Sequence, residues 1–514
     1  MDTALFARAR RRLDIGRVAP SIAIESRVKS PISRKNYGLM FQANYSHTSR
    51  SQFRGERIEY TGRTPSWLEW DQHSPRHNYE YKLRLSRNLL YLKRKNLNIT
   101  SEFSYFYIQS YSRDARTRME LEDTVPSSAA LLPSTTADAN WQVDQLNTYL
   151  TGEFKRNHLL RPQFSLRFKK ATIRLLANYN FSHRRLLDQR AGNDQHITRR
   201  DQTFSTSVTL NVGKLRTFYS YTQFLPPMSQ LMAVRDASDW QNVFLGNPDL
   251  KKSVQHTVGL SYNRSWTKRA RWFNISLQGN LNDKAIGQER TYDATTGIYT
   301  TKPRNVDGSW NTSLNTGYGQ QLGKARRLSL STGAWGSIRR SVDFSWVAQT
   351  TGSGSSVRSK VYNYNAGAEA SLTYRTQGGI HVGAKGRLDH TRQTARPVAY
   401  YRNAFTNYSY GLTLTLPLTA KLGLETDAMA YARSGYADRT MNGTDFVWNA
   451  SLSFTPDRKK QWLLRAVAFD ILHELKTVQR TVNDQGYTET WYNTIPSYIT
   501  LHAVYRINVK PKKH

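Results

Sequence analysis

Side chains of alternating polarity recur along this chain in stretches of nine or more residues, and this pattern limits the possible folds more than any other feature. In one stretch, Phe204, Val208 and Val212 share a face, while serine, threonine and asparagine occupy the other. A period of two residues is that of a β-strand with one apolar and one polar face. The chain is therefore predicted to be all-β. The clearest stretches are residues 204–212, 272–282, 362–374 and 408–416.

The length of these stretches separates a membrane barrel from a water-soluble β-sandwich, whose strands also alternate. Sandwich strands usually run about 5–6 residues, whereas a transmembrane strand needs about 9–11. Tyrosines such as Tyr362, Tyr374 and Tyr408 end several apolar stripes, as in the aromatic girdle of a membrane barrel. The longest apolar run, residues 428–432, is far shorter than the roughly 18 residues of a transmembrane helix. We therefore predict a transmembrane, antiparallel up-and-down β-barrel over residues 1–514.

Short and long connections alternate from residue 162 onward, which assigns the two ends of the barrel. Outer-membrane barrels have short periplasmic turns and longer extracellular loops. We therefore expect the C-terminus, after a last strand near 497–508, in the periplasm. The predicted short turns are 169–170, 213–214, 267–269, 321–326, 376–379, 417–419 and 456–460. The predicted long connections are 185–200, 225–253, 284–304, 342–358, 393–401, 434–444 and 474–496.

The number of strands follows from the same spacing. About fifteen fall after residue 162, and the total is about 20–22, near the 22 of plugged transporters. Residues 1–30 remain unassigned, and residues 509–514 are expected to form a basic periplasmic tail. Residues 1–12 are basic but lack the apolar core of a secretion signal. Because a barrel has to be exported, we expect the chain to be part of a longer protein and its barrel to be incomplete at the N-terminus. The candidate strands in the first 160 residues are 37–48, 78–88, 97–110 and 143–154.

The net charge of +36 implies an acidic partner. Aromatic residues among lysines and arginines can stack nucleic-acid bases, but here the aromatic residues follow the strand alternation, so we expect no nucleic acid. The favoured hypothesis is that loop cations bind lipopolysaccharide phosphates; the alternative is a basic lumen for anionic cargo. The basic residues cluster at 8–12, 93–95, 184–185, 324–327, 458–460 and 510–513.

Catalytic and metal-binding motifs are absent from the sequence. There is no cysteine, which excludes disulfides, thiolate metal sites and cysteine nucleophiles. The 12 histidines form no HExxH motif and no pair at ligand spacing, and His381 and His390 are expected on a strand or its rim. No GxSxG motif occurs. We expect no catalytic residue, no metal site, no cofactor and no enzyme activity; a hydrolase with a Ser–His pair is the alternative.

One segment carries a recognisable motif. Between Tyr219 and Leu260, a proline-containing loop leads into the sequence GNPDL, which continues with Lys251, Lys252 and Ser253. This segment resembles TonB-dependent outer-membrane receptors, in which the motif usually continues Lys-Pro-Glu. Residues 290–308 resemble a further loop of that family. The C-terminal sequences FDIL, TETWYN and IPSY are similar to the related outer-membrane-protein β-barrel family.

The motif residues Gly246, Asn247, Pro248 and Asp249 are interpreted as a structural turn rather than a substrate contact. Proline fixes φ, while glycine and asparagine tolerate unusual backbone angles. Asp470 and Trp491 are likewise interpreted as packing or loop-tethering residues.

The resemblance covers about residues 160–510 and implies a barrel that follows an N-terminal plug and a TonB-contacting segment. It implies a protein of the bacterial outer membrane, in contact with its lipid and lipopolysaccharide, that imports a bulky nutrient. In a full-length protein the plug domain and TonB would be its partners. The sequence does not identify the cargo. A non-transporting scaffold or adhesion barrel and an unplugged passive porin are the alternative functions.

Overall fold

The computed structural model describes the chain between residues 6 and 506 apart from short segments. The basic tail predicted at 509–514 lies outside the described residues. The segments left out between residues 6 and 506 are 19–20, 30–35, 60–65, 122–140, 146, 191–193, 233–234, 240–241, 294–297, 348–354, 397–401, 437–441, 458–460, 475–476, 483–486 and 493–496.

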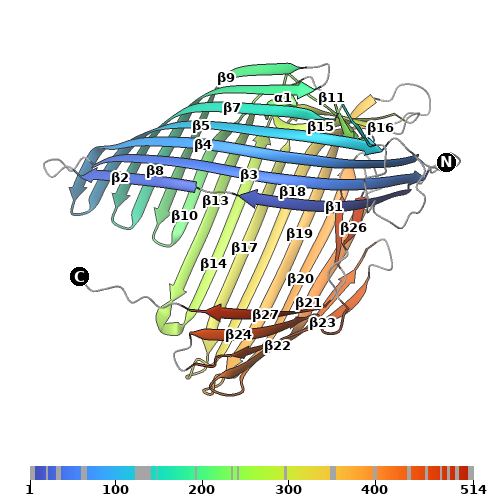
Figure 1. Cartoon of the computed structure of the whole chain (residues 1–514). Helices are drawn as coiled ribbons and strands as arrows, with labels where there is room; N and C mark the ends of the chain where they lie inside the picture. Colours follow the sequence, from blue (N-terminus) through green and yellow to red (C-terminus); the bar gives the residue numbers. More distant parts are fainter. Residues whose placement is uncertain are drawn as a thin grey trace.

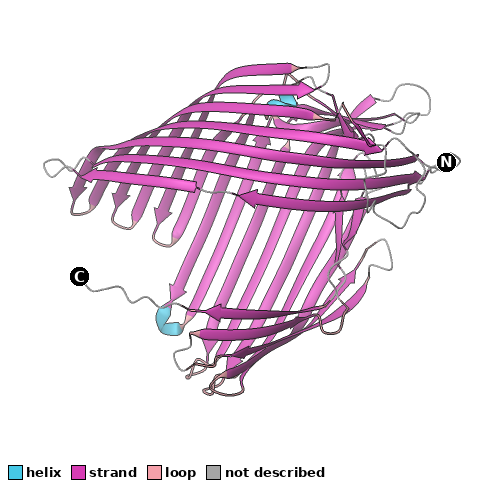
Figure 2. Ribbon diagram, viewed as in Figure 1, coloured by secondary structure: helices cyan, strands magenta, loops and turns pink. Residues whose placement is uncertain are grey.

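One strongly curved sheet contains 25 strands, and twenty of them make its wall (Figures 1 and 2). β1 and β2 pair with different parts of the same neighbour, β3, and so occupy one position in the wall. The wall is therefore nineteen strands wide, and we call each of these nineteen positions a stave. The wall strands are β1 (Phe6–Val18), β2 (Ser21–Lys29), β3 (Asn36–Glu59), β4 (Ser66–Arg94), β5 (Leu97–Leu121), β7 (Tyr149–Phe168), β8 (Ala171–Arg190), β9 (Gln195–Val212), β10 (Leu215–Phe224), β13 (Ser253–Trp266), β14 (Arg271–Asp283), β17 (Ser309–Leu322), β18 (Leu328–Val347), β19 (Ser355–Arg375), β20 (His381–Arg396), β21 (Arg402–Pro417), β22 (Leu422–Ser434), β23 (Gly443–Phe454), β24 (Trp462–Phe469) and β27 (Tyr498–Tyr505).

The remaining elements lie in the connections. A parallel ladder joins β12 to β16 within the connections, and a second parallel ladder joins β15 to the wall strand β18. No helix among the described residues is long and apolar enough to cross a membrane. These elements are β6 (Trp141–Val143), α1 (Met228–Leu231), β11 (Arg235–Asp239), β12 (Asn242–Leu245), the 3-10 turn η2 (Thr267–Arg269), β15 (Ala285–Asp293), β16 (Ile298–Val306), β25 (Thr477–Val482) and β26 (Tyr487–Tyr492).

The two faces of the wall differ as the alternation predicts. Large apolar side chains are exposed on one face, for example Val208 at 39% and Leu412 at 62%. On the other face, small polar residues bond across strands, as where the Thr257 hydroxyl donates to Asn280 Oδ1 at 2.7 Å. An exposed apolar face is stable only against lipid, and the polar face lines the lumen. The predicted all-β transmembrane sheet is confirmed.

The two edges of the sheet do not pair in the part of the chain that the structure describes. β27 pairs only with β24, while β1 and β2 pair only with β3. An odd number of antiparallel staves makes the first and last run in the same direction, so β2 and β27 cannot form an antiparallel pair. The sequence predicted a barrel of about 20–22 strands. The described residues form a wall of nineteen staves whose two edges do not pair.

Short turns lie at one end of the wall and long connections at the other, as predicted. Two-residue turns join β7 to β8 and β9 to β10, where Lys169 and Gly213 adopt positive φ of 46° and 60°. β1 begins at the long-connection end of the wall, whereas β27 ends at the short-turn end, where Tyr505 lies opposite Trp462 at the start of β24 (Figure 1). We assign the long-connection end to the cell exterior because outer-membrane barrels carry their long loops there.

The predicted long connection at 185–200 is wrong. β8 continues to Arg190 and β9 starts at Gln195, so only residues 191–194 connect them. Residues 284–304 and 474–496 are not plain loops either, because each contains a β-hairpin. The candidate strand at 143–154 begins too early, since β7 starts at Tyr149.

The wall strands are much longer than a membrane requires. β4 has 29 residues and β5 has 25, whereas about 9–11 residues cross the bilayer. The strands therefore continue beyond the lipid, and the upper wall carries the candidate site described next.

Candidate functional site

The connection after β10 folds against the lumenal face of the wall. Its helix α1 places Met228 and Leu231 in contact with Leu186 of β8, and each of the three side chains is at most 6% exposed. Met232 and Leu250 complete this apolar cluster. The Arg184 guanidinium holds the entry of the connection, because its Nη1 donates to the carbonyl of Pro226 at 2.7 Å. Apolar burial thus fixes a long connection inside the wall.

Gly246 and Asn247 fasten the far end of the same connection. A Cβ on Gly246 would lie 1.4 Å from the carbonyl oxygen of Met232, so only glycine fits. The backbone N–H of Asn247 donates to the carbonyl of Gln230 at 2.6 Å, and its side-chain Nδ2 donates to Pro303 O at 2.8 Å. The motif therefore ties α1 to the hairpin of β15 and β16.

Pro248 and Asp249 lie at the exposed end of the motif. The carbonyl of Pro248 accepts from Arg199 Nη2 at 2.8 Å, and the N–H of Asp249 donates to Asn247 Oδ1 at 3.1 Å. No side-chain hydrogen bond of the Asp249 carboxylate occurs among the described residues. That these four residues form a structural turn rather than a substrate contact stays a prediction.

The other residues singled out from the sequence lie elsewhere on the wall. Asp470 is fully buried after β24, where its N–H donates to Asn449 Oδ1 at 2.9 Å. Trp491 lies in β26, opposite Val478. His381 and His390 both lie in β20, and His390 Nδ1 is 2.9 Å from the Thr406 hydroxyl. None of these residues lies near the motif in the wall's strand order.

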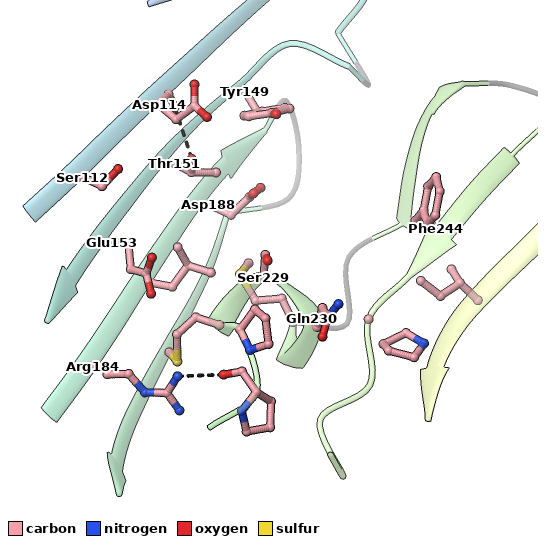
Figure 3. Close-up of a pocket in the computed structure, with 18 of the residues that line it drawn as sticks. Ser112, Asp114, Tyr149, Thr151, Glu153, Arg184, Asp188, Ser229, Gln230 and Phe244 are labelled. Carbon is pink, nitrogen blue, oxygen red and sulfur yellow. Dashed lines mark hydrogen bonds between the residues drawn. The ribbon is translucent and has the colours of Figure 1, made fainter. Parts of the chain in front are cut away.

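A cavity of about 620 Å³ separates the inserted connection from the wall, and we call it the vestibule (Figure 3). Its volume falls within the roughly 300–1,000 Å³ of ligand pockets. The wall contributes lumen-facing residues of four consecutive staves, β4, β5, β7 and β8. The connections contribute α1, the Gly246 turn and part of β15 and β16. Residues that line the vestibule include Arg76, Ser112, Asp114, Tyr149, Thr151, Glu153, Lys155, Arg184, Asp188, Arg190, Ser229, Gln230, Phe244 and Gln288.

Charged groups of both signs line the vestibule. Two of its acids are paired along their own strands: Glu153 with Lys155 at 2.9 Å and Asp188 with Arg190 at 2.8 Å. The carboxylate of Asp114 makes no hydrogen bond or ion pair with any described residue. Figure 3 shows Asp114 beside Thr151, whose hydroxyl donates to the Asp114 backbone carbonyl at 3.3 Å. These groups can hold a polar ligand through several hydrogen bonds.

Tyr149 adds an aromatic surface to this wall. Its ring lies under two guanidinium groups, with Arg116 Cζ at 4.6 Å and Arg190 Cζ at 4.7 Å from the ring centre. Such cation–π contacts hold an aromatic ring and its cations in fixed positions. The vestibule therefore combines fixed charges, an aromatic ring and backbone carbonyls.

The vestibule lies above the apolar band of the membrane. Arg184 is about 13 residues along β8 from Ala171, which at ~3.3 Å per residue and a tilt of about 40° is roughly 33 Å. The apolar band is only about 25 Å tall. The vestibule thus opens on the side that we assign to the cell exterior.

This site was not predicted from the sequence. Arg184 and Arg185 were predicted to lie in a loop, whereas both lie in β8. The signal that was present is the alternation of Arg184, Leu186, Asp188 and Arg190, which share the lumenal face. No group of three or more histidine, aspartate or glutamate residues able to hold a metal occurs among the described residues.

Solved structures that resemble the chain include the outer membrane transporter YddB from Escherichia coli, which is 8% identical with a TM-score of 0.40; 95% of this chain and 74% of that one are covered. The copper transporter OprC is 9% identical with a TM-score of 0.44, covering 96% and 80%. BauA, the ferric preacinetobactin receptor from Acinetobacter baumannii, is 9% identical with a TM-score of 0.41, covering 98% and 80%. No curated protein sequence matches the chain.

Residues 203–397 match the model of the outer membrane protein beta-barrel family. The matched segment begins in β9, ends just after β20 and includes the inserted connection with Gly246 and Asn247. The family resemblance predicted from the sequence is therefore confirmed. With its lipid-facing sheet, the chain is an integral protein of the bacterial outer membrane, and residues 203–397 match the outer membrane protein beta-barrel family.

Proposed function

We propose that this chain is the barrel portion of a TonB-dependent receptor-like transporter that takes up a nutrient through the outer membrane. The vestibule is the observation that carries the proposal. It is a polar cavity of ligand size on the lumenal wall, near the end of the wall that we assign to the exterior. The proposal includes no catalytic step. In a full-length protein, the plug domain would close the lumen and TonB would supply energy.

The vestibule suits the capture of a polar ligand. The Asp114 carboxylate and the Arg76 guanidinium both line it and have no partner among the described residues. A ligand that offers hydrogen-bond donors and acceptors can satisfy these groups as it leaves water. The inserted connection covers this site from the lumenal side, so a ligand in the vestibule contacts both the wall and the connection.

Growth on single limiting nutrients tests the proposal. Cells that lack the full-length protein are grown with iron chelates, cobalamins or oligosaccharides as the limiting source. We expect one class to fail, and wild-type protein to restore growth. Thr151→Trp fills the vestibule and should not restore growth, whereas Leu150→Trp, on the opposite face of the same strand, should.

Three results would count against the proposal. Growth that never depends on the protein would favour a scaffold or adhesion barrel. Uptake that persists when an uncoupler removes the proton-motive force would favour a passive porin, because TonB-dependent transport needs that energy. Full rescue by Thr151→Trp would remove the vestibule as the capture site.

A further inference from the structure

A second cavity, of about 670 Å³, lies on the other side of Arg184 from the vestibule, and we call it the basic pocket. It forms where β9 extends beyond the end of its neighbour, β10. β10 pairs with β9 only as far as Thr222 opposite Ser205, and β10 itself ends at Phe224. Residues that line the basic pocket include Arg184, Arg199, Asp201, Lys251, Lys252 and Lys284.

Beside this pocket, side chains form hydrogen bonds with the backbone of β9 where β9 has no partner strand. The Lys252 ammonium donates to the carbonyl of Gln202, and the N–H of Phe204 donates to Gln223 Oε1 at 3.0 Å. The gap in the sheet is thus bridged by side chains rather than by a strand.

Cations outnumber acids in the basic pocket. Five lysine and arginine residues line it, against two carboxylates, those of Asp201 and Asp283. Asp201 is held by Arg184 at 2.8 Å, and Asp283 lies 3.4 Å from His256 Nε2. Neither acid pairs with the Lys251 or Lys284 ammonium, and no other described residue does. The pocket therefore has an uncompensated positive charge.

Asn305 holds the backbones of Lys251 and Lys284 next to each other. Its Oδ1 accepts from the Lys251 N–H at 2.7 Å, while its Nδ2 donates to the carbonyl of Lys251 at 3.0 Å and of Lys284 at 2.8 Å. The N–H of Lys284 is fixed by Asp307 Oδ1 at 2.6 Å. Lys284 has a φ of +51°, in the left-handed region that favours glycine or asparagine. The hydrogen bonds of Asn305 and Asp307 therefore hold the Lys284 backbone in this conformation.

We propose that the basic pocket binds a phosphate monoester group. A phosphate monoester carries up to two negative charges and three acceptor oxygens, which suits two adjacent lysines with Arg199 nearby. The pocket lies at the start of β13, about 13 residues above the turn at Trp266, or roughly 33 Å. That height is beyond the apolar band, so the phosphate can come from a lipid headgroup of the outer leaflet or from a soluble compound.

Binding measurements on the purified chain, refolded in detergent, test the proposal with two probes. Glucose 6-phosphate represents the soluble source. Vesicles with lipid A, compared with vesicles of dephosphorylated lipid A, represent the membrane source. The double variant Lys251→Gln, Lys284→Gly removes both charges, and glycine keeps the positive φ at position 284. Lys268→Gln, in the exposed turn η2 at the other end of the wall, removes a charge as control.

We expect wild type to bind at least one probe, the double variant to bind it at least tenfold more weakly, and Lys268→Gln to bind it like wild type. Binding should also weaken as salt is added. The probe that binds identifies the source of the phosphate. Equal affinity of wild type and the double variant, or no binding of either probe by wild type, would overturn the proposal.

A second measurement covers the case in which the double variant does not fold. Acetylation of wild-type lysines is followed by mass spectrometry with and without each probe. Bound phosphate should protect Lys251 and Lys284 and leave Lys268 unprotected; uniform labelling would overturn the proposal. The inference does not rest on nutrient uptake, so phosphate binding can fail while uptake is observed, and the reverse.

Discussion

Replacing Val208 by arginine tests the assignment of the two faces of the wall. Val208 is 39% exposed on the apolar face of β9, opposite Leu175 and Tyr219. It lies about four residues from Val212, where β9 turns, so its height above the turn is roughly 10 Å. Half of the apolar band is about 12 Å, which places Val208 near the bilayer midplane.

An arginine at the midplane on the lipid face costs roughly 2–4 kcal/mol. We therefore expect Val208→Arg to lower the folding equilibrium constant roughly 30- to 900-fold. Ser207→Arg is the matched control, because Ser207 faces the lumen beside Leu176 and Ser220 and has no cation opposite it. Thr209 is a poorer control, since Arg174 lies opposite it.

Denaturant titrations of folding into lipid vesicles measure both variants. We expect a small change for Ser207→Arg, because its side chain enters a wet lumen. A penalty for Ser207→Arg that equals or exceeds the penalty for Val208→Arg would refute the assignment of lipid and lumen faces along β9.

Three further predictions follow. Leu231→Ala removes a buried side chain of the inserted connection and should lower its stability by about 2–5 kcal/mol. Amide hydrogen exchange of residues 225–232 should therefore accelerate, while β8 keeps its protection. Unchanged exchange of residues 225–232 would contradict the packing of Leu231. Backbone N–H groups of Gln461 and Trp462 lower the pKa of Asp457 in its turn, so Asp457→Ala should lower the unfolding midpoint near pH 7. A carboxylate with a lowered pKa stabilises the fold above its unfolded pKa of about 3.9, and this is lost as pH falls through the folded pKa, so an Asp457→Ala effect that persists in acid would contradict it. The chain has no cysteine, so an impermeant maleimide on intact cells should label Asp249→Cys and not Lys324→Cys; the reverse would invert the topology.

The membrane-spanning part of the fold could be predicted because the polarity of each residue there matches the lipid or the water that it faces. Lipid on one face and water on the other force the alternation seen at Val208 and its neighbours. Turns such as Gly213–Lys214 were predictable for a similar reason, since a two-residue turn needs a residue that tolerates positive φ.

Above the lipid this signal disappears. Both faces of a strand are then exposed to water or to other polar groups, so charged residues can follow one another. Arg184 and Arg185 are adjacent and on opposite faces of β8, which looked like a loop in the sequence. The strand predictions therefore ended too early wherever the wall rises beyond the membrane.

The candidate site could not be predicted because distant segments build it. The vestibule needs β4, β5, β7, β8 and the connection after β10 together, and no local pattern states that they meet. Gly367 is a smaller example of a contact between strands that the local sequence does not predict. Its Cβ would lie 2.3 Å from the Trp335 indole, so the glycine leaves room for a ring on the neighbouring strand.

The functional importance of the basic residues depends on where they lie in the structure, not on their total number. Cations such as Lys169 and Lys324 lie in turns at the short-turn end, where an exposed charge needs no partner. Lys251 and Lys284 lie at the opposite end of the wall, where Asn305 fixes their backbones and no described acid neutralises them. Both groups add equally to the net charge, yet only the second is organised to recognise an anion. A binding hypothesis therefore belongs to the basic pocket and not to the total charge.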